Sequence, residues 1–252
     1  MLLVSDVHDA PDALRALAAR GEPILILGDL LNFIDYRTGE GIVADVLGVG
    51  FSRRVAVARG SGGDVRGLWR EAIASYKGDF RAAVFERAEV QYAEAFAALA
   101  GAEVHLTYGN VDIVPLLEEA AGGIPVLDGD VVEIEGWRVG FIGGTGRTLF
   151  DLGAPNPLEG RLDALGPVDI LCTHVAPAIP PLALDVITGR PERSSESLLG
   201  YLERERPPFH YFGDIHQPRA RRWRIGTTLS QNVGYFRATG IPARHPARTD
   251  RR

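Results

Sequence analysis

Several short apolar runs in this chain end in side chains that can bind a hard or borderline metal ion. One such ending means little, because a lone Asp or His after a strand is usually a solvated turn or a packed residue. Here the pattern recurs at five separate places, so it predicts a metal site, and the lack of thiolates argues against structural zinc. The seven oxygen or imidazole donors are Asp6, His8, Asp29, Asn110, His174, Asp214 and His216.

These donors need strands that end close together. Apolar segments bounded by turn residues predict strands at Met1–Ser5, Ile24–Leu27 and Val104–Thr107. Segments with apolar residues at helical spacing, "DALRALAAR" and "IVPLLEEAAGG", alternate with them. This alternation predicts an α/β fold, and open α/β sheets bind ligands outside the carboxyl ends of their strands. We therefore expect the donors to line one cleft.

The second half of the chain predicts further strands and a capped helix. Apolar and polar residues alternate around Glu135–Gly136, which is typical of a hairpin. "PVDILCTH" and "FHYFGD" read as buried strands, and "RWRIGTTLSQNVGYF" as a closing set of strands. "SSESLLGYLERE" predicts a helix with a serine cap.

A long segment between the second and third strands is not needed by this pattern. It runs from Asp35 to Gly101 and begins with a stretch rich in glycine and charge. From Leu68 to Leu99 apolar residues recur at helical spacing, with Gly78 as a break. The segment could cap the cleft or form a subunit contact, or it could be a helical hairpin packed on its own sheet.

Composition bounds the domain organisation. The chain has 252 residues, 46% hydrophobic and 24% charged, which are values of an ordinary globular protein without internal repeats. We expect a single domain at residues 1–241, containing a mainly helical insertion at about 36–101. The proline and arginine content of the last residues, 242–252, predicts a basic, disordered tail.

Charge and cysteine content limit the partners. A net charge of -6 argues against a protein that coats nucleic acid by bulk electrostatics. The single cysteine, Cys172, excludes an internal disulfide framework. No apolar run approaches the ~20 residues of a membrane helix, and site residues follow the first strand at once, leaving no removable signal peptide. We expect a cytoplasmic protein without a membrane partner.

The donor residues at the strand ends, taken in their order along the chain, resemble the motifs of the calcineurin-like metallophosphoesterases. The resemblance runs from Met1 to about Gly234 and leaves out the insertion. It implies a sandwich of two mixed β-sheets flanked by helices, carrying a helical insertion. The blocks that match are Asp6 with His8, Gly28 with Asp29, Gly109 with Asn110, His174, and Gly213 with Asp214 and His216.

The resemblance also implies two divalent ions bridged by Asp29. Asp6, His8, Asp29 and His216 would hold one ion, and Asp29, Asn110, His174 and Asp214 the other. Asp29 and Asn110 are thereby assigned catalytic roles. This donor set suits manganese first, with iron or zinc as alternatives. Two ions about 3.5 to 4 Å apart can share a hydroxide that attacks a phosphoryl group in line.

The implied function is a metal-dependent phosphoric ester hydrolase with a small phosphorylated substrate. A phosphodiester is favoured over a monoester, because a diester needs fewer positive charges around the phosphate. The alternative is a weakly active or non-catalytic scaffold with the same fold. A homo-oligomer formed through the helical insertion is a further expectation.

The chain departs from the family pattern at three positions. Asp214 stands where the last block usually has its first His, which adds negative charge and favours harder metals. Val111 and then Asp112 follow Asn110, where many members have a His that can protonate the leaving group. Such acid catalysis typically contributes 10²- to 10⁴-fold. Asn32 replaces a second Asp after the Gly-Asp block.

Overall fold

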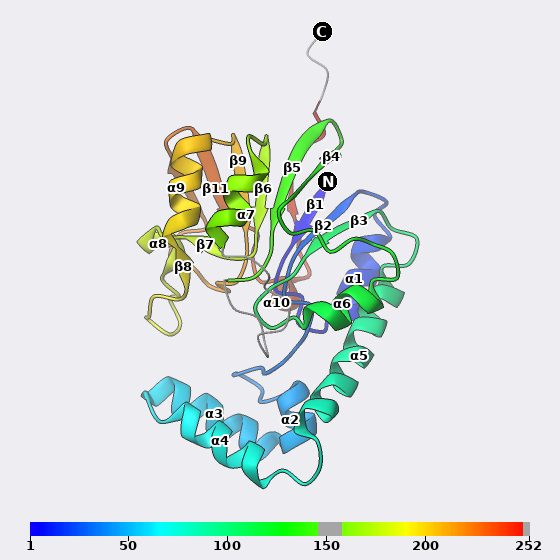
Figure 1. The fold of residues 1–252 in the computed structure, drawn as a ribbon, viewed down its shortest axis with the longest axis vertical. Coiled ribbons are helices and arrows are strands. Elements are labelled where there is room, and N and C mark those ends of the chain that lie inside the picture. Colours follow the sequence, from blue (N-terminus) through cyan, green and yellow to red (C-terminus); the bar gives the residue numbers. More distant parts are fainter. Residues whose placement is uncertain (146–157, 249–252) are drawn as a thin grey trace.

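The computed structural model describes residues 1–145 and 158–248. It shows two β-sheets packed against each other, with helices on their outer faces (Figure 1). The protein is therefore a mixed α/β protein with two multi-stranded sheets flanked by helices, as the alternation of strands and helices predicts.

The first sheet holds the N-terminal strands. Its order is β12-β1-β2-β3, with β1, β2 and β3 parallel and β12 antiparallel to β1 at the edge. Leu2 and Val4 of β1 pack towards the helices, whereas Leu3 packs towards the other sheet. The bounds are β1 (Leu2–Val4), β2 (Ile24–Leu27), β3 (Val104–Thr107), β12 (Ala243–Arg244), α1 (Pro11–Ala18) and α6 (Val114–Ala120).

The second sheet has the order β10-β11-β9-β6-β5-β4. Its four inner strands are parallel, and the two outer strands run antiparallel to their neighbours. The strands are β4 (Asp130–Ile134), β5 (Trp137–Ile142), β6 (Ile170–Thr173), β9 (Phe209–Phe212), β10 (Arg222–Ile225) and β11 (Thr228–Asn232). The remaining elements of this half are α7 (Leu158–Leu165), β7 (Ala176–Pro177), α8 (Pro180–Ala183), β8 (Ser194–Ser195), α9 (Glu196–Glu205) and α10 (Phe236–Thr239).

Three hydrophobic clusters hold these layers together. One lies between the sheets and includes Leu25, Phe141 and the buried thiol of Cys172. A second joins the first sheet to its helices, and a third joins the second sheet to α7 and α9. Because alternate strand residues face opposite sides, the central strands β1, β2, β5 and β6 each contribute to two clusters.

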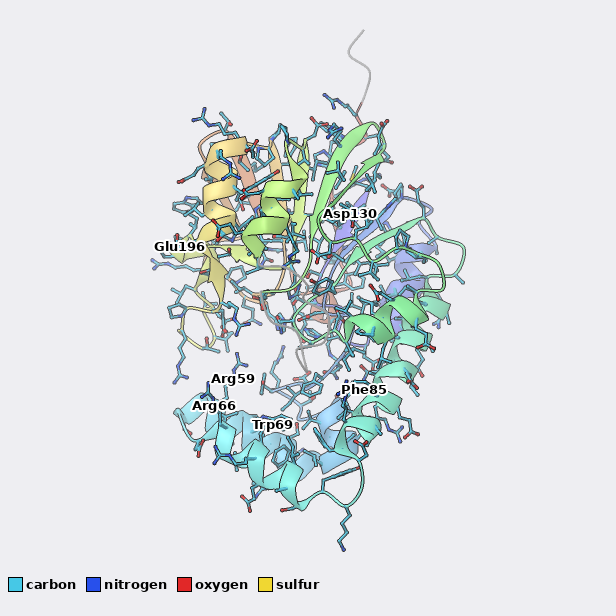
Figure 2. All side chains as sticks on the ribbon, viewed as in Figure 1. Arg59, Arg66, Trp69, Phe85, Asp130 and Glu196 are labelled. Atoms are coloured by element: carbon cyan, nitrogen blue, oxygen red, sulfur yellow. The ribbon has the colours of Figure 1, made fainter. Side chains whose placement is uncertain are left out.

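The segment between β2 and β3 is helical. It contains α2 (Ile42–Leu47), α3 (Val49–Ser61), α4 (Val65–Ser75) and α5 (Phe80–Ala98). The predicted break is confirmed, because Gly78 lies between α4 and α5 with φ +119°. Trp69 of α4, labelled in Figure 2, stacks on Phe33, and the ring centroids are 6.1 Å apart. No helix within the described residues is long and apolar enough to cross a membrane.

The insertion contacts both halves of the molecule. Its last helix, α5, packs on α1 and α6 beside the first sheet. At the end of α3, the guanidinium of Arg59 lies 3.4 Å from the carboxylate of Glu192, in the loop that precedes β8. Arg190 of the same loop donates to the carbonyl oxygens of Arg59 and Gly60 at 3.1 and 3.4 Å. These contacts join the insertion to the second sheet's side of the molecule.

The prediction of a disordered tail from Pro242 is wrong for residues 242–248. Ala243 and Arg244 pair with β1, and the backbone N–H of His245 donates to the carbonyl of Met1 at 3.1 Å. The ring of His245 is buried, with Nδ1 2.7 Å from the hydroxyl of Tyr211. These long-range contacts order the segment in spite of its proline and arginine content. Residues 249–252 lie outside the described part of the chain.

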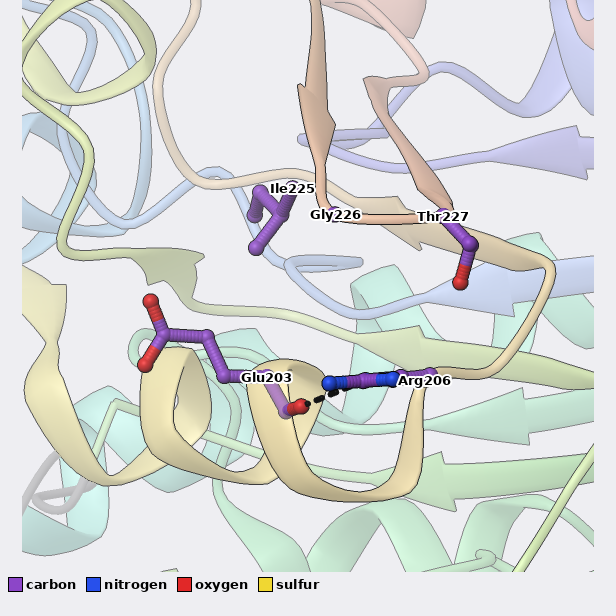
Figure 3. Close-up of a pocket in the computed structure, with 5 residues that line it drawn as sticks. All are labelled: Glu203, Arg206, Ile225, Gly226 and Thr227. Carbon is purple, nitrogen blue, oxygen red and sulfur yellow. Dashed lines mark hydrogen bonds between the residues drawn. The ribbon is translucent and has the colours of Figure 1, made fainter.

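A surface hollow lies between the end of α9 and the turn from β10 to β11 (Figure 3). Within it, Arg206 Nε donates to the carbonyl of Glu203 at 3.2 Å. The hollow is at the amino end of β11, and the predicted donors follow the carboxyl ends of parallel strands. It is therefore remote from the candidate site.

A buried histidine makes the stability of the fold depend on pH. His210 is fully buried between Thr173 and Ser230, and burial lowers its pKa from 6.5 to about 3. Below pH 6.5 the unfolded chain takes up a proton that the folded chain cannot accept until about pH 3. Stability should therefore fall over this range, by at most about 1.4 kcal/mol per pH unit from this residue.

We expect His210→Gln to flatten the dependence of the free energy of unfolding on pH between about 4 and 6.5, as measured by urea denaturation. His105→Gln is the matched control, because His105 pairs at the surface with Glu103. Equal slopes for wild type and His210→Gln would contradict the prediction.

Candidate metal centre

The parallel strands of both sheets end at one edge, and backbone hydrogen bonds tie these ends together. Asp6 N–H donates to the carbonyl of Gly28 at 3.1 Å, and Gly213 N–H to that of His174 at 3.1 Å. The two sheets are joined directly, because Asp214 N–H donates to Oδ2 of Asp6 at 3.1 Å. Donors that are distant in the sequence therefore lie together.

One group of side chains gathers around Asp6. The possible ligand atoms of Asp6, His8 and His216 all lie within 4.8 Å of one another. Nε2 of His216 is 3.3 Å from Oδ1 of Asp6 and 3.2 Å from Nε2 of His8. This arrangement offers one carboxylate and two imidazoles to an ion.

A second group gathers around His174, and Asp6 and Asp29 also belong to it. Nε2 of His174 lies 3.3 Å from Oδ1 of Asn110 and 3.7 Å from Oδ1 of Asp214. The structure thus brings all seven predicted donors into one cluster. Oδ2 of Asp29 lies 3.6 Å from Nε2 of His174 and 3.8 Å from Nε2 of His8, between the two groups.

The backbone at this edge is strained. Asp6, His8, Asp29 and Asp214 have φ values of 56°, 43°, 57° and 65°. Residues other than glycine rarely adopt this left-handed region, which costs on the order of 1–3 kcal/mol each and is concentrated at functional sites. The strain turns these side chains towards the cluster. Gly109 is required beside them, because a Cβ there would overlap the side chain and backbone of Asp29.

A buried carboxylate, Asp112, supports the turn after β2. Its Oδ2 accepts hydrogen bonds from the backbone N–H groups of Asp29 and Gly109, both at 2.8 Å. Its Oδ1 accepts from Leu30 N–H at 3.1 Å and from the Tyr92 hydroxyl at 3.2 Å. Asp112 therefore joins the ends of β2 and β3. In the sequence, Asp112 stands out only as a departure from the family pattern, so this role could not be predicted from it.

Two of the imidazoles are oriented by the backbone. Nδ1 of His8 lies 2.8 Å from the carbonyl oxygen of Leu31, and Nδ1 of His174 lies 2.8 Å from that of Leu27. A carbonyl only accepts, so Nδ1 carries the proton in both rings and Nε2 is left as the ligand atom. Metal-binding histidines in proteins usually have such a partner.

The charges of the cluster are strongly coupled. Burial opposes ionisation of Asp6, but the close approach and charge of His216 outweigh it and lower the pKa of Asp6 to about 2. Burial, with the charges of Asp29 and Asp6, raises the pKa of Asp214 to about 7. The pKa of His174 is raised to about 9, because the neighbouring carboxylates outweigh its burial. The ionisation of each of these groups therefore depends on its charged neighbours.

One atom tests directly whether a cation fits. Oδ1 of Asp6 is buried and has no hydrogen-bond partner within the described residues, although the imidazole of His216 is at 3.3 Å. An unpaired buried carboxylate oxygen is costly, and a divalent ion would pair with it. The residue types and this orphaned oxygen therefore fit a metal ion.

Comparison with known proteins shows the fold only. No family model and no curated protein matches the chain. One solved crystal structure is similar with a TM-score of 0.55 and 13% identity, over 93% of this chain and 90% of that chain. The crystal structure of TT1561 of Thermus thermophilus gives 0.54 and 15%, over 94% and 89%. The chain is a mixed α/β protein with an Asp/His cluster that could bind metal.

Proposed function

We propose that this protein is a metal-dependent phosphoric ester hydrolase of the calcineurin-like metallophosphoesterase type, with phosphodiesters as its preferred substrates. The observation that supports this most is the position of Asp29. Its carboxylate lies between two histidine-containing groups, 3.6 Å from His174 and 3.8 Å from His8. A bridging carboxylate between two ions needs this position.

Two divalent ions would be held by two overlapping sets of residues. Bound there, they would supply an activated water and would neutralise charge on the phosphate. The carboxylate, imidazole and amide donors suit manganese first, and iron or zinc as alternatives. The first set is Asp6, His8, Asp29 and His216, and the second is Asp29, Asn110, His174 and Asp214.

The preference for a substrate with a good leaving group rests on Val111. This residue follows Asn110, and its backbone N–H donates to Oδ1 of Asp29 at 3.0 Å. Its backbone orients the bridging carboxylate, but its aliphatic side chain cannot protonate a leaving group. Substrates whose leaving group needs no general acid should therefore react best.

Hydrolysis of bis-p-nitrophenyl phosphate, compared with p-nitrophenyl phosphate in the presence of manganese, tests this proposal. We expect turnover of the diester to be faster, to stop when a chelator removes the metal, and to return when manganese is restored. Metal analysis of the purified protein should find two ions per chain. If folded protein turns over neither substrate with manganese, iron or zinc, the non-catalytic scaffold is the correct interpretation.

A further inference from the structure

The three histidines of the metal cluster are held unequally. The side chains of His174 and His8 are 0% and 12% exposed, and a backbone carbonyl fixes each ring. The side chain of His216 is 36% exposed, and its Nδ1 has no hydrogen-bond partner within the described residues. If Nε2 of His216 is to bind the proposed ion beside Asp6, a group other than a backbone carbonyl must orient its ring.

The ring of Tyr235 orients the imidazole of His216. It lies face to face with the imidazole of His216, with centroids 3.9 Å apart and planes inclined by 8°. It also meets the edge of His8, with centroids 5.9 Å apart and planes inclined by 76°. The stack leaves the His216 ring few orientations, and the ring keeps Nε2 towards Asp6 and His8.

Tyr235 stands on a turn that is tied to the loop of His216. Asn232 Nδ2 donates to the carbonyls of Gly213 and Ile215 at 3.3 and 3.0 Å. Oδ1 of Asn232 accepts from Gly234 N–H at 2.8 Å, directly before Tyr235. On the other side, the buried Phe236 donates its N–H to the carbonyl of Ser5 at 3.1 Å. The aromatic face is therefore built on a fixed support.

We propose that Tyr235 is a positioning residue for His216, and that its ring, rather than its hydroxyl, maintains the ion position shared by Asp6, His8, Asp29 and His216. This inference rests on the proposed function, because it requires two bound ions. The second position uses His174, which the carbonyl of Leu27 orients, and it should not depend on Tyr235. The two ions should thus respond differently to one substitution.

The test measures manganese binding by equilibrium dialysis, with metal counted by mass spectrometry, in wild type, Tyr235→Leu and Tyr235→Phe. Groups that orient metal ligands typically contribute 10- to 100-fold to affinity. We expect Tyr235→Leu to weaken one of the two ions by about this factor and to leave the other unchanged. Tyr235→Phe keeps the aromatic face and should bind both ions as the wild type does.

The test also includes a control variant and a replacement for a variant that does not fold. Tyr36→Leu is the matched control, because Tyr36 is an exposed ring that contacts Arg59. It should bind both ions normally. Thermal unfolding of each metal-free variant checks the fold, and Tyr235→Met replaces Tyr235→Leu if the latter is unfolded.

Three results would overturn the inference. Tyr235→Leu could bind both ions with wild-type affinity, or it could weaken both ions equally. Tyr235→Phe could be as weak as Tyr235→Leu, which would assign the effect to the hydroxyl. Absence of metal binding in the wild type would instead overturn the proposed function together with this inference, so the two failures are distinguishable.

Discussion

Asp29→Ala should abolish both metal uptake and phosphodiester hydrolysis. The carboxylate of Asp29 is near Nε2 of both His8 and His174, so its removal would take a ligand from each of the two proposed ion positions. Bound metal contributes several kcal/mol to catalysis, and each 1.4 kcal/mol is a factor of ten. We therefore expect a loss of at least about a thousandfold in kcat/KM for bis-p-nitrophenyl phosphate.

Metal content and turnover are measured on the same preparations. Asp12→Ala is the control, because this carboxylate is 96% exposed and its ion pair among the described residues is with Arg15 on the same helix. It should retain two ions and full activity. Two bound ions in folded Asp29→Ala would contradict a bridging role for this residue.

Asp112→Ala should cost about 3 to 5 kcal/mol of the free energy of unfolding. Alanine leaves the buried N–H groups of Asp29, Leu30 and Gly109 without their acceptor. The ends of β2 and β3 then lose the group that joins them, so metal affinity should fall as well. Asp112→Asn keeps the shape and one acceptor oxygen and should cost less.

Chemical denaturation of the metal-free protein gives these values. The comparison variant is Asp64→Ala, which removes a carboxylate that caps α4 through one N–H, that of Gly67, at 2.8 Å. Loss of a single helix cap costs typically about 1 kcal/mol. If Asp112→Ala costs no more than Asp64→Ala, the buried carboxylate does not hold the turn.

Elements with strong local signals were predictable from the sequence. Ile24–Leu27 and Val104–Thr107 are short apolar runs between turn residues, and both form strands with these bounds. Ser195 caps α9 as expected and accepts from Leu198 N–H at 3.1 Å. In each case residues adjacent in sequence determine the structure.

Elements stabilised from a distance were not predictable in this way. Ala243 and Arg244 form a strand only because the edge of β1 is free to pair with them. Nothing near Val49–Ser61 marks α3 as clearly, since its apolar residues do not gather on one face.

The same contrast between local and long-range determinants applies to the candidate metal centre. The seven predicted donors could be picked out because their residue types and strand-end positions are local features. The partners of Asp112 lie as far as 83 positions away in the chain, and Tyr235 meets His216 because the segments after β11 and β9 lie together in the fold. Residues that hold ligands in place are therefore visible only in the folded protein.

The spread of the donors along the chain has a consequence for synthesis. The first donor is Asp6 and the last is His216, and the backbone of Asp214 completes the link to Asp6. A nascent chain on the ribosome therefore cannot complete this cluster of side chains until His216 has emerged. On the proposed function, both ions could be bound only after residue 216 has been synthesised, and a product truncated before His216 would lack a ligand of the first ion position.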